Sequence, residues 1–339
     1  MKTYKNLYEK ICSFENLHSA YLKARKGKQY RNEILEFSYN LEENLLKLQA
    51  ELKSKTYKHG KYREFVVCDS KKRLIKAAPF RDRVVHHALC NVIEPIFEKG
   101  FIGDSYACRK GKGTHRAIKR VEEFWRSAED SQNFKEKRLY CLQCDVSKYF
   151  DSIDHEILMS IIRKKISDRD TLRLIEEVVS SDGHKRFHEN LFDYRMTGIP
   201  IGNLTSQLFA NIYLNELDRF VKHGLGEKSY VRYMDDFLIL SHDKGSLQLL
   251  KQEIKEFLAD NLELALHPTK ANVFPVDKGI DFLGYRIFGG AGEYRLLRKS
   301  TIKRFMKKMK RYREKLDAEE ITKKRIYCSV RSWRVYAEF

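Results

Sequence analysis

The sequence predicts an α+β fold built around an antiparallel sheet, and three observations lead to this class. Two apolar, β-prone runs, 139–146 and 230–240, have acidic residues where the first ends and where the second turns. Apolar residues at helical spacing occupy the segments between and around these runs. The resulting order is strand, helices, long helix, hairpin, helix and strand, which differs from the regular alternation of a doubly wound parallel sheet.

The N-terminal part of the chain predicts helices followed by a strand. Its first sixty residues are highly charged and have apolar residues at helical spacing. After Gly60 the run 64–68 is β-like, and the basic segment 70–73 then predicts a loop. A helix is expected to begin near Asp82, because apolar residues recur at helical spacing beyond it.

A Gly/Lys loop at 111–114 precedes a helix that is expected to continue through Trp125. The backbone amides of such a loop suit a phosphate. The spacing of a P-loop is missing, however, and a plain loop with a Thr cap is the alternative. The strand that ends at Asp145 comes next, and Asp154 is a good N-cap for a helix over 155–165.

Residues 198–202, Gly-Ile-Pro-Ile-Gly, break the chain before a long amphipathic helix over 204–221. The run 230–240 follows and predicts a hairpin with buried strands and Met-Asp-Asp at its tip. Another amphipathic helix is expected after this hairpin, and a further strand follows the helix.

The last segment, 295–339, is strongly basic. It contains 16 Lys or Arg and five Asp or Glu, an excess of 11 positive charges. We expect a helix with one face for packing and another for phosphates, while a merely solvated basic face is the alternative. The apolar positions at helical spacing are Ile302, Phe305, Met306, Met309, Tyr312 and Leu316.

Composition predicts a soluble protein with a polyanionic partner. The formal net charge of +19 favours nucleic acid or an anionic membrane surface. No apolar run approaches the length of a membrane span and no signal-peptide core follows Met1, so we expect a cytoplasmic protein without membrane contact. The seven cysteines are expected to be reduced. Cys141 and Cys144 form a Cys-x-x-Cys within an apparent strand, where we favour burial over metal or redox chemistry.

The adjacent carboxylates of Asp235 and Asp236 are costly charges between two apolar strands. A divalent cation would compensate for them, and oxygen ligands suit Mg²⁺. An exposed Asp-Asp turn is the alternative. If the hairpin pairs beside the strand that ends at Asp145, three carboxylates converge on one sheet edge, which is what two-metal phosphoryl transfer needs.

The chain resembles the reverse transcriptases over about residues 60 to 290. The Tyr-Met-Asp-Asp sequence at 233–236 resembles the signature hairpin of that family, and Asp145 with an aromatic residue five positions later resembles its first catalytic segment. Residues 202–206 are similar to the segment under the templating base, and 282–285, Phe-Leu-Gly-Tyr, to the strand near the primer. Residues 73–83 are similar to the finger motif that meets the nucleotide triphosphate.

The resemblance implies an RNA-directed DNA polymerase with right-hand architecture. Fingers would occupy 1–135, an antiparallel-sheet palm 136–293 with an inserted helical fingers segment near 155–195, and a short basic helical thumb 294–339. The substrates would be an RNA template, a DNA or RNA primer and dNTPs. Two Mg²⁺ ions would be the cofactors, with Mn²⁺ as a substitute.

The resemblance also implies roles for single residues. Asp145, Asp235 and the carbonyl of Val146 would hold the ions, with Asp236 in support. Phe150 would exclude the 2′-hydroxyl of a ribonucleotide, and a core phenylalanine is the alternative. The other contacts to the nucleotide would come from Arg73, Lys76, Arg83, Ile201, Gly202, Gln207 and Lys270, although Lys270 is also read as a surface lysine. The thumb contacts to nucleic acid would be Lys303, Lys307, Lys308, Lys310 and Arg311.

One departure from the common family pattern indicates a subgroup. Many reverse transcriptases have Gln-Gly-x-x-x-Ser-Pro at the template-facing segment, whereas Ile201 and Gln207 stand at the first and last positions here. This resembles the reverse transcriptases of diversity-generating retroelements, which copy a template repeat RNA with errors at adenines in mutagenic retrohoming. Because Ile201 supplies shape but no hydrogen bond, discrimination near the nascent base pair would be weaker.

The length of the chain is consistent with the same subgroup. Since the sequence ends at Phe339, we expect an enzyme without its own endonuclease, maturase extension or RNase H domain. Members of the subgroup work with a small, basic, pentameric accessory protein, which is therefore an expected partner. A group II intron-like, retron or defence-associated reverse transcriptase is the nearest alternative, and a non-catalytic RNA-binding protein on a polymerase scaffold is an alternative of another class.

Overall fold

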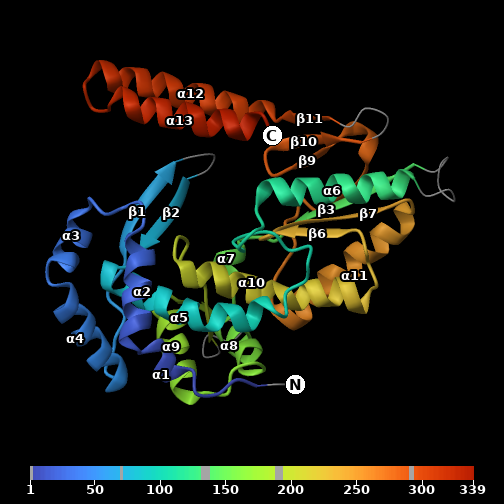
Figure 1. Cartoon of the computed structure of the whole chain (residues 1–339). Coiled ribbons are helices and arrows are strands. Elements are labelled where there is room, and N and C mark those ends of the chain that lie inside the picture. Colours follow the sequence, from blue (N-terminus) through green and yellow to red (C-terminus); the bar gives the residue numbers. More distant parts are fainter. Residues whose placement is uncertain (1–2, 69–71, 131–137, 188–193, 290–293) are drawn as a thin grey trace.

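A computed structural model describes residues 3–68, 72–130, 138–187, 194–289 and 294–339. At the centre of this described part is an antiparallel sheet with the strand order β6-β7-β3-β8 (Figure 1). Its strands are β3 (Tyr140–Asp145), β6 (Tyr230–Tyr233), β7 (Asp236–Ser241) and β8 (Asn272–Pro275). The expected hairpin of two buried strands is therefore confirmed as β6 and β7, and β7 pairs with β3.

Helices cover both faces of this sheet, which explains why its strands are almost continuously apolar. Helix α11 (Lys244–Leu262) packs on one face, and α6 (Thr114–Glu129) packs on the other. Successive strand residues alternate between the faces, so Cys141 lies in the α6 cluster and Cys144 in the α11 cluster. Both thiols are fully buried. The expected burial of this Cys-x-x-Cys is confirmed.

The N-terminal region forms a helical layer with a projecting hairpin, at the blue end of Figure 1. The hairpin pairs β1 with β2 in antiparallel register. Lys72 and Arg73, expected in a loop, instead belong to β2 because they pair with Cys68 and Val67, whereas 69–71 lie outside the described residues. Helix α5 begins at Phe80, two residues before the expected start. The elements are α1 (Tyr8–Ile11), α2 (Phe14–Arg25), α3 (Asn32–Tyr39), α4 (Leu41–Lys53), β1 (Arg63–Cys68), β2 (Lys72–Ala77) and α5 (Phe80–Glu98).

The Gly/Lys loop before α6 does not have the expected Thr cap, and two of its amides are bound within the protein. The amides of Lys112 and Gly113 donate to the carbonyls of Arg109 and Tyr106, at 3.2 and 3.1 Å, so these two donors are used within the protein. Gly113 is the N-cap residue, and the Thr114 hydroxyl donates to the Tyr233 hydroxyl at 3.3 Å instead of capping the helix. The loop is thus tied to the β6 strand.

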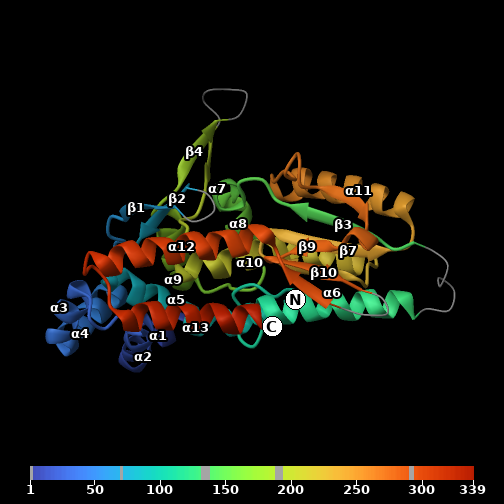
Figure 2. The same ribbon diagram turned by 90° about the horizontal axis from the view of Figure 1, so that it is seen from above.

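The segment expected to be an inserted helical part of the fingers is only partly helical. It contains α8 (His155–Arg163) and α9 (Arg169–Ser180), and the expected N-cap is confirmed because Asp154 accepts from the Ile157 amide at 2.9 Å. It then forms the antiparallel pair β4 (His184–Phe187) and β5 (Tyr194–Thr197), which projects from the body in Figure 2. The segment near 155–195 thus contains a strand pair in addition to the expected helices, because cross-strand pairing overrides local spacing.

Helix α10 (Leu204–Arg219) runs through the centre of the molecule and contacts α5, α8 and α11. The sequence predicts an amphipathic helix with one apolar face, but this helix is buried on most sides because three helices surround it. A π-helical turn, η2 (Phe220–Gly224), follows it. A short helix, α7 (Tyr149–Ser152), lies between β3 and α8.

The C-terminal region is a small sheet followed by two helices that lie side by side in both views (Figures 1 and 2). The described strands β9 (Ile280–Phe282), β10 (Tyr285–Phe288) and β11 (Tyr294–Leu297) form the antiparallel sheet. Residues 282–285, expected as a strand, include the turn between β9 and β10. At this turn Leu283 and Gly284 have φ of +49° and +93°. A Cβ at Gly284 would lie 2.3 Å from the Tyr336 hydroxyl oxygen, so this position requires glycine.

The basic helical segment is a pair, α12 (Lys299–Asp317) and α13 (Lys323–Ala337). Its seam includes Phe305 and Trp333, whose rings stack at 4.1 Å between centroids. Ile302 and Met306, expected on the packing face, are exposed because the seam uses the neighbouring helix positions. The far end of α13 returns to the small sheet, where Tyr285 donates to the carbonyl of Tyr336, and the hydroxyl of Tyr336 donates to the carbonyl of Leu283 at 3.1 Å.

None of the helices in the described residues has the length and apolar composition that crossing a membrane requires.

Candidate active site

Three carboxylates lie at one end of the central sheet. Asp145 is the last residue of β3 and Asp236 the first of β7, and the two are direct partners in the antiparallel register. Asp235 precedes Asp236 in the hairpin turn, and its carbonyl accepts from the Val146 amide at 3.1 Å. The two strands therefore bring together the acidic residues that the sequence predicted would converge.

The turn that positions Asp235 is tight and has a strained residue. Met234 has φ of +58°, the left-handed region that side chains with a Cβ rarely adopt. Such strain persists only where surrounding contacts hold the backbone. The guanidinium of Arg232 supplies one of these contacts, because its Nη1 donates to the carbonyl of Met234 at 3.0 Å.

Arg232 is itself held by a buried ion pair. Its Nε and Nη2 atoms donate to the two carboxylate oxygens of Asp218 on α10, each at 2.6 Å, and neither side chain is exposed. Burial alone would lower the pKa of Arg232, but the Asp218 carboxylate raises it overall, so the group stays charged. The hydroxyl of Tyr230 also donates to Asp218, at 2.7 Å. The sequence reasoning missed this support; an arginine inside an apolar strand is the signal that would have found it.

Asp236 is perturbed by its surroundings. Burial raises its pKa to about 7, the charges of Asp145 and Asp235 act in the same direction, and a hydrogen bond from Gln143 opposes them. Gln143 lies two residues before Asp145 on β3, so both side chains are on the same face. Its Nε2 donates to Asp236 at 3.3 Å and to the Asp281 carbonyl at 3.0 Å. The sequence reasoning also missed Gln143, whose signal is a polar side chain inside an apolar strand.

Lys270 lies directly at the carboxylates. Its ammonium forms an ion pair with Asp145, and the backbone amide of His267 donates to the Asp145 carbonyl at 2.7 Å. The Lys270 side chain is 45% exposed, so the charge also reaches solvent. Of the two sequence interpretations, contact with the site is favoured over an unattached surface lysine.

The donor atoms at this sheet edge fit a divalent cation. Carboxylate oxygens of Asp145, Asp235 and Asp236 and the carbonyl of Val146 are the hard ligands that Mg²⁺ prefers. The mutual repulsion that helps raise the pKa of Asp236 is what a cation would relieve. Within the described residues, no three His, Cys, Asp or Glu side chains are gathered closely enough to hold an ion in the present arrangement. Lys270 supplies the positive charge beside Asp145 instead.

Phe150 lies in α7, five residues after Asp145. Its ring is half-buried and meets the ring of Tyr149 edge to face at 5.6 Å, and its carbonyl accepts from the Ile199 amide at 2.9 Å. The preceding Lys148 has φ of +45°, a second strained residue near the carboxylates. The sugar-excluding role of Phe150 stays a prediction.

The predicted phosphate contacts of the fingers do not form one cluster in the described residues. Lys76 pairs with Asp182 at 2.5 Å, and its amide donates to the carbonyl of Ile201 at 3.4 Å. Arg83 lies on α5 and pairs with Glu33 of α3, so it supports the helical layer. Arg73 is in β2 opposite Val67, and its side chain lies outside the described residues.

The segment that was predicted to face the template lies at the start of α10. Gly202 has φ of +116°, and a Cβ there would lie 3.2 Å from the Ile75 side chain of β2, so the close approach of the β1–β2 hairpin requires glycine. Ile201 and Gln207 are both partly exposed. The segment thus connects the β1–β2 hairpin with α10, the helix that supports the Asp235 turn through Asp218.

The predicted nucleic-acid contacts of the C-terminal helices lie on the exposed surface of α12. Lys308 also places its ammonium 5.3 Å from the centroid of the Tyr312 ring. The exposed residues of this set are Lys303, Lys307, Lys308, Lys310 and Arg311.

The fold and site define a class of protein. A helical layer with a projecting hairpin, an antiparallel sheet with carboxylates at one end, and a basic helical pair have the arrangement of a right-hand nucleic-acid polymerase. Residues 56–287 match a family model described as "Reverse transcriptase (RNA-dependent DNA polymerase)". The chain therefore belongs to the reverse transcriptase family.

Two curated bacterial proteins are similar in sequence to this chain. The chain is 28% identical over 258 residues to "Protein YkfC" of Escherichia coli (strain K12), covering 67% of this chain and 66% of the relative. It is 27% identical over 337 residues to "Group II intron-encoded protein LtrA" of Lactococcus lactis subsp. cremoris, covering 80% of this chain and 53% of the relative. The chain therefore spans about one half to two thirds of the length of these relatives.

Among solved structures, the chain is similar to "apo telomerase from Candida Tropicalis". The TM-score is 0.53 at 12% identity, and the match covers 68% of this chain and 47% of the telomerase chain. At this identity the likeness supports the polymerase fold alone.

Proposed function

We propose that this enzyme copies a template repeat RNA into cDNA for a diversity-generating retroelement, with errors directed to adenines. The observation that supports this proposal most is the segment 201–207, with an aliphatic residue at its start and Gln207 at its end. Ile201 lies beside β2 of the fingers and has no side-chain group that donates or accepts a hydrogen bond. A site that checks a base pair by shape alone discriminates less than one that also tests hydrogen bonds.

The catalytic residues in this proposal are Asp145, Asp235 and Asp236. Together with the carbonyl of Val146 they would hold two Mg²⁺ ions, with Mn²⁺ as a substitute. Bound ions of this kind lower the pKa of a primer 3′-hydroxyl and neutralise charge on the triphosphate and leaving pyrophosphate.

Three neighbouring residues position the carboxylates or contact them. Arg232 fixes the turn backbone, so that Asp235 is presented at the sheet edge without reorganisation. The hydrogen bond from Gln143 orients the Asp236 carboxylate. Lys270 would give up its contact with Asp145 when that carboxylate takes a metal ligand role, and its ammonium would then be free to meet the leaving pyrophosphate.

The substrate contacts follow from the same proposal. Phe150 would lie under the sugar and exclude a 2′-hydroxyl, so that dNTPs are selected. Arg73, Lys76, Arg83, Gly202 and Gln207 would line the nucleotide site; for Lys76 and Arg83 this would require release from Asp182 and Glu33. The exposed lysines of α12 would hold the RNA template and its DNA or RNA primer through their phosphates. A small, basic, pentameric accessory protein would be the protein partner, and the cytoplasm the place of action.

Primer extension by the purified chain tests this function. An RNA with a template repeat and a matched primer would be copied with and without the accessory protein, and the products sequenced. We expect Mg²⁺-dependent cDNA with substitutions concentrated opposite template adenines. Ile201→Gln should lower the error rate at adenines, whereas Ile201→Val, which keeps the aliphatic character, should leave it unchanged. Accurate copying of adenine by the wild-type chain would reject the retroelement assignment while leaving the polymerase assignment intact.

A second candidate, a group II intron-like reverse transcriptase with ordinary fidelity, is favoured by the similarity to LtrA. Flanking DNA distinguishes the two. Two near-identical repeats that differ mainly at adenines in one copy favour the retroelement, and intron boundaries around the reading frame favour the intron.

A further inference from the structure

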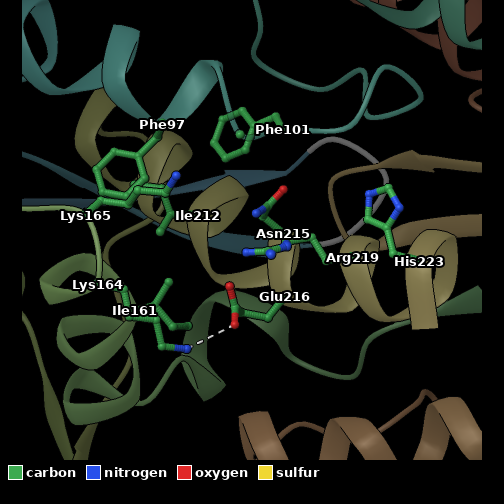
Figure 3. A pocket seen from close by; sticks show the side chains of 11 residues that line it. Phe97, Phe101, Ile161, Lys164, Lys165, Ile212, Asn215, Glu216, Arg219 and His223 are labelled. Carbon is green, nitrogen blue, oxygen red and sulfur yellow. Dashed lines mark hydrogen bonds and ion pairs between the residues drawn. The ribbon is translucent and has the colours of Figure 1, made fainter. Parts of the chain in front are cut away.

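A second pocket lies apart from the carboxylates, at the C-terminal ends of α5, α8 and α10. It has a volume of about 270 Å³, and it shares no residue with the candidate active site. Figure 3 shows its lining, and we call it the rear pocket. Its size is near the lower end of the range for small-molecule sites.

One side of the rear pocket is apolar and partly aromatic. The rings of Phe97 and Phe101 lie on this side, and Ile161 and Ile212 continue the wall (Figure 3). Phe97 and Ile212 are buried, whereas Phe101 is partly exposed. Phe101 is therefore the ring of this wall that an unstacked nucleobase can meet, and the guanidinium carbon of Arg109 lies 5.3 Å from the centroid of the same ring.

The rest of the lining is cationic. Lys164, Lys165 and Arg219 stand against a single acid, Glu216, which pairs with Lys164 at 3.2 Å. No carboxylate among the described residues forms an ion pair with Lys165 or Arg219. Helix C-termini attract cations without any ligand, which accounts for Lys164 and Arg219 at the ends of α8 and α10. The helix dipole does not explain why the charge of Arg219 has no carboxylate partner among the described residues.

An amide group completes the site. The Oδ1 atom of Asn215 is buried and has no hydrogen-bond partner, and its side chain points into the rear pocket in Figure 3. An unmade hydrogen bond of a buried polar atom is costly, so a rotation of the Asn215 amide that brings Oδ1 to a ligand donor would be offset by the new hydrogen bond. The donor and acceptor pair of an Asn amide matches the edge of a nucleobase. A Cβ at Gly100 would lie 3.7 Å from the Lys165 ammonium, so the absent side chain leaves room beside this charge.

We propose that the rear pocket binds one nucleoside phosphate unit, with its base against the ring of Phe101, its base edge at Asn215 and its phosphate beside Lys165 and Arg219. The unit is either a free nucleotide or an unstacked residue of an RNA strand. If the unit belongs to an RNA strand, the enzyme would bind RNA at a site outside the polymerase site.

Photo-crosslinking tests this proposal on the full chain. The probes are 8-azidoadenosine 5′-monophosphate and a short single-stranded RNA that contains one 8-azidoadenosine, and mass spectrometry locates the modified peptides. We expect modification of the segments 97–101 and 212–223. Asn215→Leu or Arg219→Gln should weaken it about tenfold or more, as loss of a charge-assisted or buried hydrogen bond does. Lys255→Gln, an exposed residue of α11, is the matched control and should have no effect.

Competition separates the two sources of the ligand. If unlabelled AMP displaces both probes, the ligand is a free nucleotide; if only single-stranded RNA displaces them, it is an RNA residue. Displacement by inorganic phosphate alone, or modification that the two pocket variants leave unchanged, would overturn the proposal. Primer extension on a pre-annealed template and primer should be retained by both variants. Asp235→Asn should lose extension and keep the crosslink, so failure of the polymerase assignment is distinguishable from failure of this site.

Discussion

The buried ion pair of Arg232 and Asp218 allows the loss of unfolding free energy on substitution to be predicted. Both side chains have no exposed surface, and two hydrogen bonds of 2.6 Å join them. Arg232→Met would leave the Asp218 carboxylate buried without compensation, which costs about 3–5 kcal/mol of unfolding free energy. The exposed pair of Arg163 and Glu176 is the matched control, since both partners are about half exposed and Arg163→Met should cost about 0–1 kcal/mol.

Urea denaturation followed by circular dichroism measures both variants. The double variant Arg232→Met with Asp218→Leu removes the charge along with its partner, so it should recover most of the lost free energy. It should not recover DNA synthesis, because the hydrogen bond to the Met234 carbonyl is still missing. A loss below about 1 kcal/mol in Arg232→Met, or a double variant as unstable as the single one, would refute the reasoning.

Further predictions concern the carboxylate site and the basic helix α12. Asp235→Asn should abolish Mg²⁺-dependent extension while a filter-binding assay shows RNA binding retained; residual synthesis at wild-type rate would remove Asp235 from the site. Phe150→Val should admit ribonucleotides, which product analysis with NTPs would detect, and unchanged selection would leave Phe150 as a core residue. Since the pKa of Asp236 is raised to about 7, a proton competes with the cation below that pH, and the Mg²⁺ concentration for half-maximal activity should rise as the pH falls. In the metal-free protein the same shift stabilises the fold at low pH and is lost as the pH rises through about 7, so Asp236→Asn should flatten the profile of unfolding free energy. Lys307→Ala with Lys308→Ala should reduce the salt dependence of template–primer binding, and an unaltered slope would make this face merely solvated.

The parts of the site that are local in sequence could be predicted. The hairpin with Asp235 and Asp236 follows from two apolar runs around a short polar tip, and the strand before Asp145 from one more run. The pairing of this hairpin with the Asp145 strand was a conditional prediction, and the structure confirms it because β7 is the antiparallel neighbour of β3.

The parts of the site that depend on contacts between distant residues could not be predicted from the sequence. Asp218 reads as a polar position of a helix until Arg232, which is on a strand, is placed against it. Arg83 and Lys76 read as phosphate contacts, but their partners, Glu33 and Asp182, come from elements far away along the chain. The β4–β5 pair similarly exists only through contacts between strands. A sequence shows which residues are charged, whereas the ion pairs that they form depend on the tertiary structure.

The hydrogen bonds at the far end of α13 have a mechanical consequence. Helix α12 leaves the small sheet close to Gly284, and α13 comes back to the same turn, where Tyr336 is joined to Leu283 and Tyr285. Both ends of the helical pair are thus held near this turn, where the ring of Phe339 also stacks on His115 of α6 at 3.7 Å between centroids, whereas the connection near 318–322 is at the opposite end of the two helices. We therefore expect α12 and α13 to move together about this attachment. If a bound primer shifts the β9–β10 turn slightly, the displacement of the connection near 318–322 would be larger than the shift of the turn.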